Sequence, residues 1–519
     1  MGQLRHSHLR RVLIVSLLLA GLWRPTVFRE GAAVGRAYAH GVAGLGQAAA
    51  TAQAEKALWL SQPGLAATDP ISPTDSGGGE YRLLDVSDLS DQQRQSIQSE
   101  IDRNIQRLGL QPLAVGLSTS LSWPLQGAAG QTDYGYHGIS GFVDHNFAYP
   151  NQLLDWNCGT RTYDLASGYN HKGTDFFTWP FGWYNMDHDI VEVVAAAPGT
   201  IVAKSDGAFD RSCSLNNNPW NAVYILHADG AVAWYGHLKQ NSVTSKAVGA
   251  AVVAGEYLGI VGSSGNSTGP HLHFELHASD GNLIDPYAGA CNPTSSWWAA
   301  QRPYFDSAVN KLTTGSAAAV FPTCPSPETP NTKDVFSPGD TVYFTTYYRD
   351  QLAGQQSRYT IYRPDGSVYS TWTHATSVTH YAASYWYWSY ALSAGVPVGL
   401  WRFEVVYQGQ VYQHNFSVGS TVDLRGRPAD HALRLDWTVW GTLPVNSTWR
   451  IAYAGPAGDQ PSPITNIMGS IRTYTLTGLT NYNWYTVTLN AIDNTFPIMT
   501  GTVTVLPTDI YVYLPQVTK

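Results

Sequence analysis

The amino-acid sequence predicts a mainly β, multidomain protein. Its 519 residues are too many for a single hydrophobic core, so several domains are expected. Only 13% of the residues are charged, while Gly, Tyr and Trp are abundant, a balance typical of β-rich extracellular domains. From residue 120 onward, short β-like runs alternate with Gly, Asn, Asp and Pro turns, and only one helical pattern precedes them.

The N-terminal residues 1–39 are predicted to be a signal peptide. Arg10 and Arg11 precede an apolar run, VLIVSLLLAGLW, which is shorter than the roughly 20 residues that a membrane span needs. An A-x-A cleavage sequence follows at residues 37–39. We therefore expect a secreted or extracytoplasmic protein that has no membrane span after processing. A buried N-terminal helix is the alternative.

Residues 40–119 are predicted to form a flexible lead-in and one helix. The stretch from 40 to about 80 is rich in small and polar residues without periodicity. A helix is expected from Ser90 to Leu108, because Ser90 and Gln93 have capping-box spacing, isoleucines follow on one stripe, and Gly109 ends the pattern. This segment is either an inhibitory propeptide or a packing helix or linker.

Three β domains are expected after the helix. The first spans residues 120–321 and ends at a Pro-rich joint, residues 322–334. A β-sandwich is predicted at 335–418, with hairpin turns at residues 364–366 and 408–409. Its aromatic run at residues 385–388, together with Trp372, is expected to pack in the core, and stacking on sugars is the alternative.

The last domain, residues 422–519, resembles a fibronectin type III domain. Strand-like runs occur at 433–437, 448–454 and 473–491, with Trp437 as the buried tryptophan and Tyr485 at the tyrosine-corner position after a Gly-Leu turn.

Charge and cysteine content limit the functional classes. The net charge of -8 provides no basic surface, so a nucleic-acid partner is excluded. The 4 cysteines have no C-x-x-C spacing, which favours disulfides over a thiolate zinc site. We favour the pairs Cys158–Cys213 and Cys291–Cys324, which join sequence neighbours, although the sequence leaves the connectivity open.

Three histidine-containing motifs carry the chemistry. In GPHLHFEL, residues 269–276, polar and apolar residues alternate, so His271 and His273 share one face of a strand. HKGTD places His171 four residues before Asp175, where a turn must bring them together. His237 ends a predicted hairpin that turns at residues 229–230.

Together these motifs resemble zinc endopeptidases of the lysostaphin and LytM type. The resemblance covers residues 120–287 and implies an antiparallel β fold of the duplicated hybrid motif, or barrel-sandwich hybrid, type. It also implies one Zn²⁺ held by His171, Asp175 and His273, and catalytic roles for His237 and His271. The substrate that it implies is bacterial peptidoglycan, and association with the cell wall is expected with it. We expect a monomer. The roles of His237 and His271 as base or oxyanion stabiliser stay open, and the position of His271 two residues before His273 on the same strand favours His271 as the base.

The roles of two further residues and the function itself have alternative interpretations. Glu275 lies on the histidine face of its strand and either orients a ligand or is solvated. His227, beside a turn, is expected to be structural. The alternative functions are a non-enzymatic wall-binding or regulatory protein and a peptidase acting on Gly-rich proteins.

Overall fold

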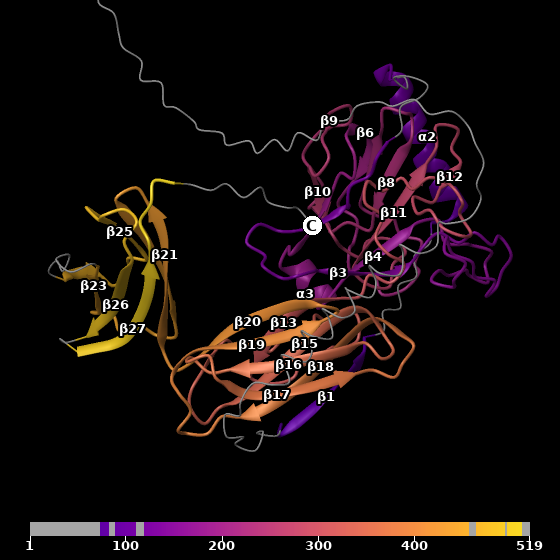
Figure 1. Ribbon diagram of the computed structural model, residues 1–519. Coiled ribbons are helices and arrows are strands. Elements are labelled where there is room, and N and C mark those ends of the chain that lie inside the picture. The colour runs from indigo at the N-terminus through magenta and orange to yellow at the C-terminus, as the bar shows by residue number, and fades with distance from the viewer. Residues whose placement is uncertain (1–72, 82–88, 111–118, 456–462, 494–495, 511–519) are drawn as a thin grey trace, which may run out of the picture. The chain divides into compact units, whose positions relative to one another are not determined.

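The computed structural model describes residues 73–81, 89–110, 119–455, 463–493 and 496–510 (Figure 1). The predicted signal peptide and most of the lead-in lie outside this part of the chain. The described part is mainly β, as predicted, with two helices and six sheets. Neither of these helices has the length and apolar character needed to cross a membrane.

The helix predicted from the capping box is confirmed as α2 (Asp91–Leu108). The Ser90 side chain accepts a hydrogen bond from the Gln93 amide, the Gln93 side chain accepts one from the Ser90 amide, and Gly109 ends the helix in the left-handed region at φ 63°. Its isoleucine stripe packs against one face of the strands β6 (Gly199–Ser205), β7 (Ala222–Leu226) and β8 (Val232–Gly236). The residues of this face are Val202, Ala203, Ala222, Tyr224, Leu226, Val232 and Trp234, with Trp220 beside them.

The largest sheet has the strand order β3-β4-β11-β8-β7-β6-β9, and β12 also pairs with β11. Its strands are β3 (His137–Gly141), β4 (Thr174–Thr178), β11 (His271–His277), β8 (Val232–Gly236), β7 (Ala222–Leu226), β6 (Gly199–Ser205), β9 (Ala251–Val252) and β12 (Leu283–Ile284). The predicted hairpin turn at Gly230 joins β7 to β8. Every pairing in this sheet is antiparallel.

A smaller sheet and one short helix complete this region. The sheet has the order β10-β5-β2, formed by β10 (Tyr257–Ile260), β5 (Val191–Val194) and β2 (Leu125–Gly127). The helix is α3 (Gly182–Asp187), which the sequence pattern did not predict. Leu272, Phe274 and Leu276 of β11 are completely buried in the core that includes residues of both sheets, so the predicted alternation is confirmed.

A second pair of sheets encloses an aromatic core. One has the order β1-β18-β15-β13, formed by β1 (Asp75–Glu80), β18 (His380–Ala391), β15 (Thr341–Leu352) and β13 (Ala308–Gly315). The other contains β14 (Val335–Phe336), β20 (Gln410–Val418), β19 (Gly399–Tyr407), β16 (Gln356–Tyr362) and β17 (Val368–Ala375). Trp372, Trp386 and Trp388 pack in this core, which supports the packing interpretation of the aromatic run.

Two strands of this pair were not expected. Residues 75–80 were predicted to be part of a flexible lead-in, but they form β1, which pairs with β18. Their glycines permit this close approach, since a Cβ on Gly78 would lie 2.1 Å from the Tyr385 carbonyl oxygen. Strand β13 precedes the Pro-rich joint yet pairs with β15, so the sheet extends beyond the residues predicted for the sandwich.

The last two sheets form a separate hydrophobic core. Their orders are β21-β22-β25 and β24-β23-β26-β27. Trp437 and Tyr485 are both buried there, and the Tyr485 hydroxyl accepts a hydrogen bond from the Thr480 amide at 3.0 Å, the contact expected of a tyrosine corner. The strands are β21 (Thr421–Ala429), β22 (Ala432–Trp440), β23 (Thr448–Ala454), β24 (Ile464–Met468), β25 (Thr473–Thr477), β26 (Tyr485–Asp493) and β27 (Phe496–Val505).

The favoured disulfide pairing is wrong. The structure joins Cys158 to Cys291 and Cys213 to Cys324, residues that are 133 and 111 positions apart. Proximity along the chain misled the prediction, because the loops that carry these cysteines are brought together by the packing of distant segments. The Cα atoms of the two pairs lie 5.1 and 5.9 Å apart.

Candidate metal centre

Three neighbouring strands bring the predicted site residues together. His273 of β11 is paired with Asp175 of β4 on one side and with Gly236 of β8 on the other. His171 lies in the turn before β4, and His237 directly follows β8 in a left-handed conformation, at φ 62°. The five predicted side chains therefore meet on one face of the sheet.

Three of these side chains direct nitrogen or oxygen atoms at one point. His171 Nε2 lies 3.1 Å from Asp175 Oδ2 and 3.4 Å from His273 Nδ1, which in turn is 2.7 Å from Asp175 Oδ1. Ligands of a tetrahedral zinc ion, each about 2.0–2.2 Å from the metal, lie roughly 3.3 Å from one another. The donor set and its spacing therefore fit a zinc-sized cation.

Further hydrogen bonds orient these three candidate ligands. His171 Nδ1 donates to the Phe142 carbonyl at 2.7 Å, which leaves Nε2 as the inward donor atom. His273 has the opposite orientation, because its Nε2 donates to Glu275 Oε1 at 2.7 Å and Nδ1 faces inward. The Tyr163 hydroxyl donates to Asp175 Oδ2 at 3.0 Å. Such outer contacts are what metal ligands in proteins normally have.

His237 and His271 present their Nε2 atoms to the same space. His237 Nδ1 donates to the Ser264 carbonyl at 2.6 Å, and His271 Nδ1 donates to the Gly269 carbonyl at 2.9 Å. Both Nε2 atoms are buried and have no hydrogen-bond partner among the described residues. The centroids of the two rings lie 4.5 Å apart, so both rings can reach the same bound group. Each Nε2 can accept a hydrogen bond from that group, or donate one once the ring is protonated.

The electrostatics of the site favour positive charge between the ligands. Burial alone would raise the pKa of Asp175, but the surrounding imidazoles hold it well below its usual range. Burial would likewise lower the pKa of His273, but Asp175 and Glu275 raise it to about 9. A cation at the inward Nδ1 of His273 would thus replace a proton that this environment already binds tightly. For His237 and His271, burial lowers the pKa, so both are neutral near pH 7.

The centre is enclosed. His171, Asp175 and His271 have no exposed surface, and His237 and His273 are only 1% exposed. The Trp220 ring lies 5.0 Å from the ring of His237 and 6.0 Å from that of His273. A Cβ on Gly236 would lie only 2.0 Å from the same indole, so the tryptophan packs directly on the backbone beside the site.

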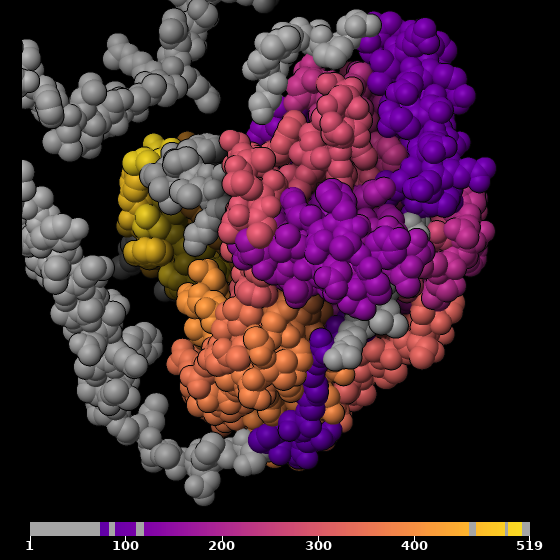
Figure 2. Space-filling view, turned by 90° about the vertical axis from the view of Figure 1, so that its right-hand side faces the viewer, coloured from indigo at the N-terminus to yellow at the C-terminus, as the bar shows by residue number. Residues whose placement is uncertain are grey.

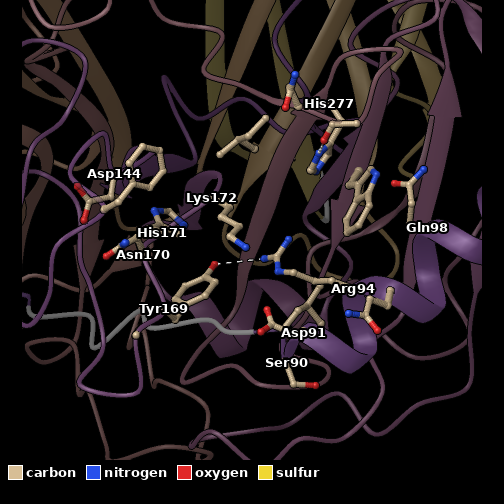
Figure 3. Close-up of a pocket in the computed structure, with 18 of the residues that line it drawn as sticks. Ser90, Asp91, Arg94, Gln98, Asp144, Tyr169, Asn170, His171, Lys172 and His277 are labelled. Atoms are coloured by element: carbon tan, nitrogen blue, oxygen red, sulfur yellow. Dashed lines mark hydrogen bonds between the residues drawn. The ribbon is translucent and has the colours of Figure 1, made fainter.

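Glu275 and Arg94 belong to this centre, although neither was assigned to it from the sequence. Glu275 is buried and accepts a hydrogen bond from the candidate ligand His273, so the first of the two interpretations, an orienting contact, is the one that the structure supports. Arg94 reaches it from α2 and lines a pocket that also contains Tyr169, Lys172 and His171 (Figure 3). Strand alternation already placed Glu275 on the histidine face, and Arg94 continues the isoleucine stripe of its helix, three positions before Ile97.

His227 lies away from this centre, as predicted. Its Nδ1 donates to the Pro198 carbonyl at 2.8 Å, and the residue is buried at the hairpin between β7 and β8. This backbone contact is a structural role.

Residues 170–286 match peptidase family M23. Over 112 residues the chain is 42% identical to the DD-carboxypeptidase/endopeptidase Mpg of Neisseria meningitidis serogroup B, an alignment that covers 21% of this chain and 24% of that protein. Over 106 residues it is 36% identical to the Peptidoglycan DD-endopeptidase ShyC of Vibrio cholerae, which covers 20% of each chain. These residues form a peptidase family M23 domain.

Among solved structures, the M23 domain is similar to the catalytic domain of lysostaphin from Staphylococcus simulans. The identity is 30%, the match covers 24% of this chain and 83% of that chain, and the TM-score is 0.18. The chain spans about a quarter or less of the length of the curated relatives named above. All five predicted site residues lie inside the M23 domain, whereas Arg94 lies outside it.

Proposed function

We propose that this protein is a zinc metalloendopeptidase that hydrolyses peptide bonds in the stem peptides or cross-bridges of bacterial peptidoglycan. The observation that carries this proposal is that five side chains converge, three as candidate metal ligands and two as candidate catalytic groups. His171, Asp175 and His273 direct donor atoms at one point, and His237 and His271 offer neutral Nε2 atoms beside it. This arrangement lies in an M23 domain.

The ligand set supports zinc as the metal. Two imidazole nitrogens and one carboxylate oxygen are the usual ligand types of a catalytic zinc ion, which keeps a further position open. Bound there, Zn²⁺ would supply Lewis acidity, lowering the pKa of a water molecule toward 7 and polarising the scissile carbonyl. We assign one ion to the M23 domain.

His237 and His271 are assigned the proton transfers. Each ring holds its Nδ1 proton in a hydrogen bond to a backbone carbonyl, so Nε2 is the atom that can accept a proton from the attacking water. The same Nε2, once protonated, can donate to the leaving amine or to the developing oxyanion. We assign the base to His271, which lies one strand step from ligand His273, and the stabilising role to His237.

The substrate class and the location rest on the relatives and on the cysteines. Peptidoglycan appears in the name of one relative, Peptidoglycan DD-endopeptidase ShyC, and another is named Glycyl-glycine endopeptidase ALE-1. The two disulfides indicate an oxidising compartment, where peptidoglycan is found. An extracytoplasmic enzyme that acts on the cell wall is consistent with both observations.

Digestion of purified sacculi tests this proposal. The zinc-loaded full-length protein would be incubated with sacculi that have direct cross-links and with sacculi that have glycine cross-bridges, and new peptide termini would be identified by mass spectrometry. We expect new termini from at least one kind and none from a His273→Ala control. If no sacculus yields new termini while a Gly-rich protein is cut, the substrate assignment is wrong. If the pure protein binds no zinc, the enzymatic proposal itself fails.

A further inference from the structure

Glu275 is a buried carboxylate whose hydrogen-bonding capacity is fully used. Oε1 accepts from His273 Nε2 at 2.7 Å and from Arg94 at 2.8 Å, while Oε2 accepts from Arg94 at 2.9 Å and from His277 Nε2 at 2.8 Å. A carboxylate has about four acceptor positions, so each one is occupied. Two of these four bonds come from the fork of a single guanidinium, the strong bidentate geometry of an arginine and a carboxylate.

Arg94 is fixed in place from several sides. Its guanidinium carbon lies 5.6 Å from the centre of the Tyr169 ring and 5.9 Å from that of Trp234, and it also bonds the Tyr169 hydroxyl at 3.4 Å. Figure 3 shows Arg94 extending from α2 toward Tyr169, on the side of the pocket where His277 also lies. The arginine is therefore held between two aromatic rings with its fork on Glu275.

Helix α2, which supplies this arginine, is anchored to the M23 domain along its length. The Gln93 side chain donates to the carbonyls of Asn217 and Asn218 at its beginning, and Asn104 donates to the Val202 carbonyl of β6 near its end. Between them, Ile97, Ile101 and Ile105 cover the sheet. In the space-filling view α2, in indigo, lies at the surface beside the purple segment that precedes β4 (Figure 2).

The face of the sheet beneath α2 is apolar. It contains Val202, Tyr224, Leu226, Val232 and Trp234, all buried in the presence of the helix. Without α2 these side chains would be exposed as one contiguous apolar patch, which soluble domains rarely tolerate. This argues against a segment that is discarded on maturation and in favour of a permanent part of the peptidase.

We propose that Arg94 is a positioning residue of the metal centre, acting through Glu275 to hold the His273 ring with Nδ1 directed at the metal. The functional unit then includes α2, and the residues that match family M23 are incomplete without it. This inference rests on the proposed function, because it assigns a part to the zinc site described above.

Zinc affinity measured on the full-length protein tests the role of Arg94. Apo-protein would be titrated with zinc against a chromophoric chelator for the parent, Arg94→Met, Arg94→Lys and, as a matched control from the exposed face of the same helix, Arg103→Met. Loss of an outer partner of a metal ligand typically weakens metal binding by about 10- to 100-fold, which we expect for Arg94→Met. Arg94→Lys keeps the charge but not the forked guanidinium, so its zinc affinity should lie between those of the parent and Arg94→Met. The zinc affinity of Arg103→Met should match that of the parent.

A double variant shows whether Arg94 acts through Glu275. Arg94→Met would leave a buried carboxylate short of partners, whereas Arg94→Met combined with Glu275→Gln removes the unpaired charge and preserves folding. If the inference holds, the double variant binds zinc no more weakly than Glu275→Gln alone. Additive losses would show that Arg94 acts elsewhere and would overturn it.

Two further outcomes separate this inference from the proposed function. If the parent binds zinc and cuts sacculi, and Arg94→Met does both equally well or cuts faster, then α2 is a dispensable or inhibitory cover and only the role of Arg94 is wrong. If the parent binds no zinc, the proposed function fails and this inference fails with it.

Discussion

Gly173 packs directly against the imidazole of His273. A Cβ built on Gly173 would lie 2.8 Å from both Cε1 and Nε2 of that ring and 2.8 Å from the Phe274 carbonyl oxygen. The glycine of HKGTD therefore leaves space for the ring of His273 in HLHFEL, although the two motifs are about a hundred residues apart. The backbone oxygen cannot swing aside as a flexible side chain would, so a larger residue here must displace β11 or the ring.

Gly173→Ala is accordingly expected to weaken the centre. Overpacking of this kind typically costs about 1–3 kcal/mol of stability, and the displaced His273 ring should bind zinc less tightly. Thermal unfolding and zinc titration would measure the two effects. Gly395→Ala is the control, because no atom of the described residues lies within 4 Å of the added methyl group. A Gly173→Ala protein with unchanged zinc affinity would show that the ring has room to move.

Zinc content and turnover, measured for His273→Ala and His271→Ala, should distinguish a metal ligand from a catalytic histidine. His273→Ala removes one of the three inward donor atoms and should abolish both zinc content and turnover. His271→Ala leaves the three donors intact and should lose turnover while it retains most of the metal. Zinc would be quantified by atomic absorption on purified protein. Equal zinc loss in the two variants would overturn the division of roles.

Stability should fall in acid because of a buried histidine outside the centre. His137 is 4% exposed, and burial, together with Arg349 and Arg302, holds its pKa well below the usual value. Above about pH 6.5, His137 is neutral in both the folded and the unfolded protein. Below that pH, His137 is protonated in the unfolded chain but stays neutral in the folded protein. This residue therefore lowers the free energy of unfolding by up to about 1.4 kcal/mol for each pH unit below 6.5, down to its folded pKa.

His137→Gln should remove that contribution. Chemical denaturation of parent and variant between pH 7 and pH 5 would measure this contribution. The residues of the candidate metal centre are the same in both proteins, so their effect on the pH dependence of unfolding cancels in the comparison. The stability of the parent should decline more steeply than that of the variant. Parallel curves would mean that the folded protein accommodates the charged imidazole.

The disulfide pairing is open to direct examination. Non-reducing peptide mapping should find Cys158 linked to Cys291 and Cys213 linked to Cys324. In the chain-entropy treatment, a bridge that closes a loop of about 100 residues stabilises the folded state by about 4.7 kcal/mol. Replacing both Cys213 and Cys324 with Ser should therefore lower Tm clearly. Peptides linking Cys158 to Cys213 would contradict this topology.

Local patterns in the sequence were sufficient for the elements that depend on neighbouring residues. The capping box at Ser90 and the stop at Gly109 predicted α2 correctly, because both depend on backbone groups within a few positions. Alternation in HLHFEL placed His271, His273 and Glu275 on one face and three apolar side chains in the core, since a strand has a two-residue period. The grouping of the five site residues came from motif resemblance.

Only the tertiary structure decided the contacts that join distant segments. Arg94 and Glu275 are 181 positions apart, and nothing local to either residue specifies the other. The same holds for the cysteine pairs and for β1, whose glycines resemble a flexible linker until Tyr385 and Tyr387 pack against them. Side-chain periodicity is a property of one element, whereas partner choice depends on how sheets and helices pack. The sequence by itself therefore predicted the residues of the candidate metal centre, and the fold decided which residues hold them there.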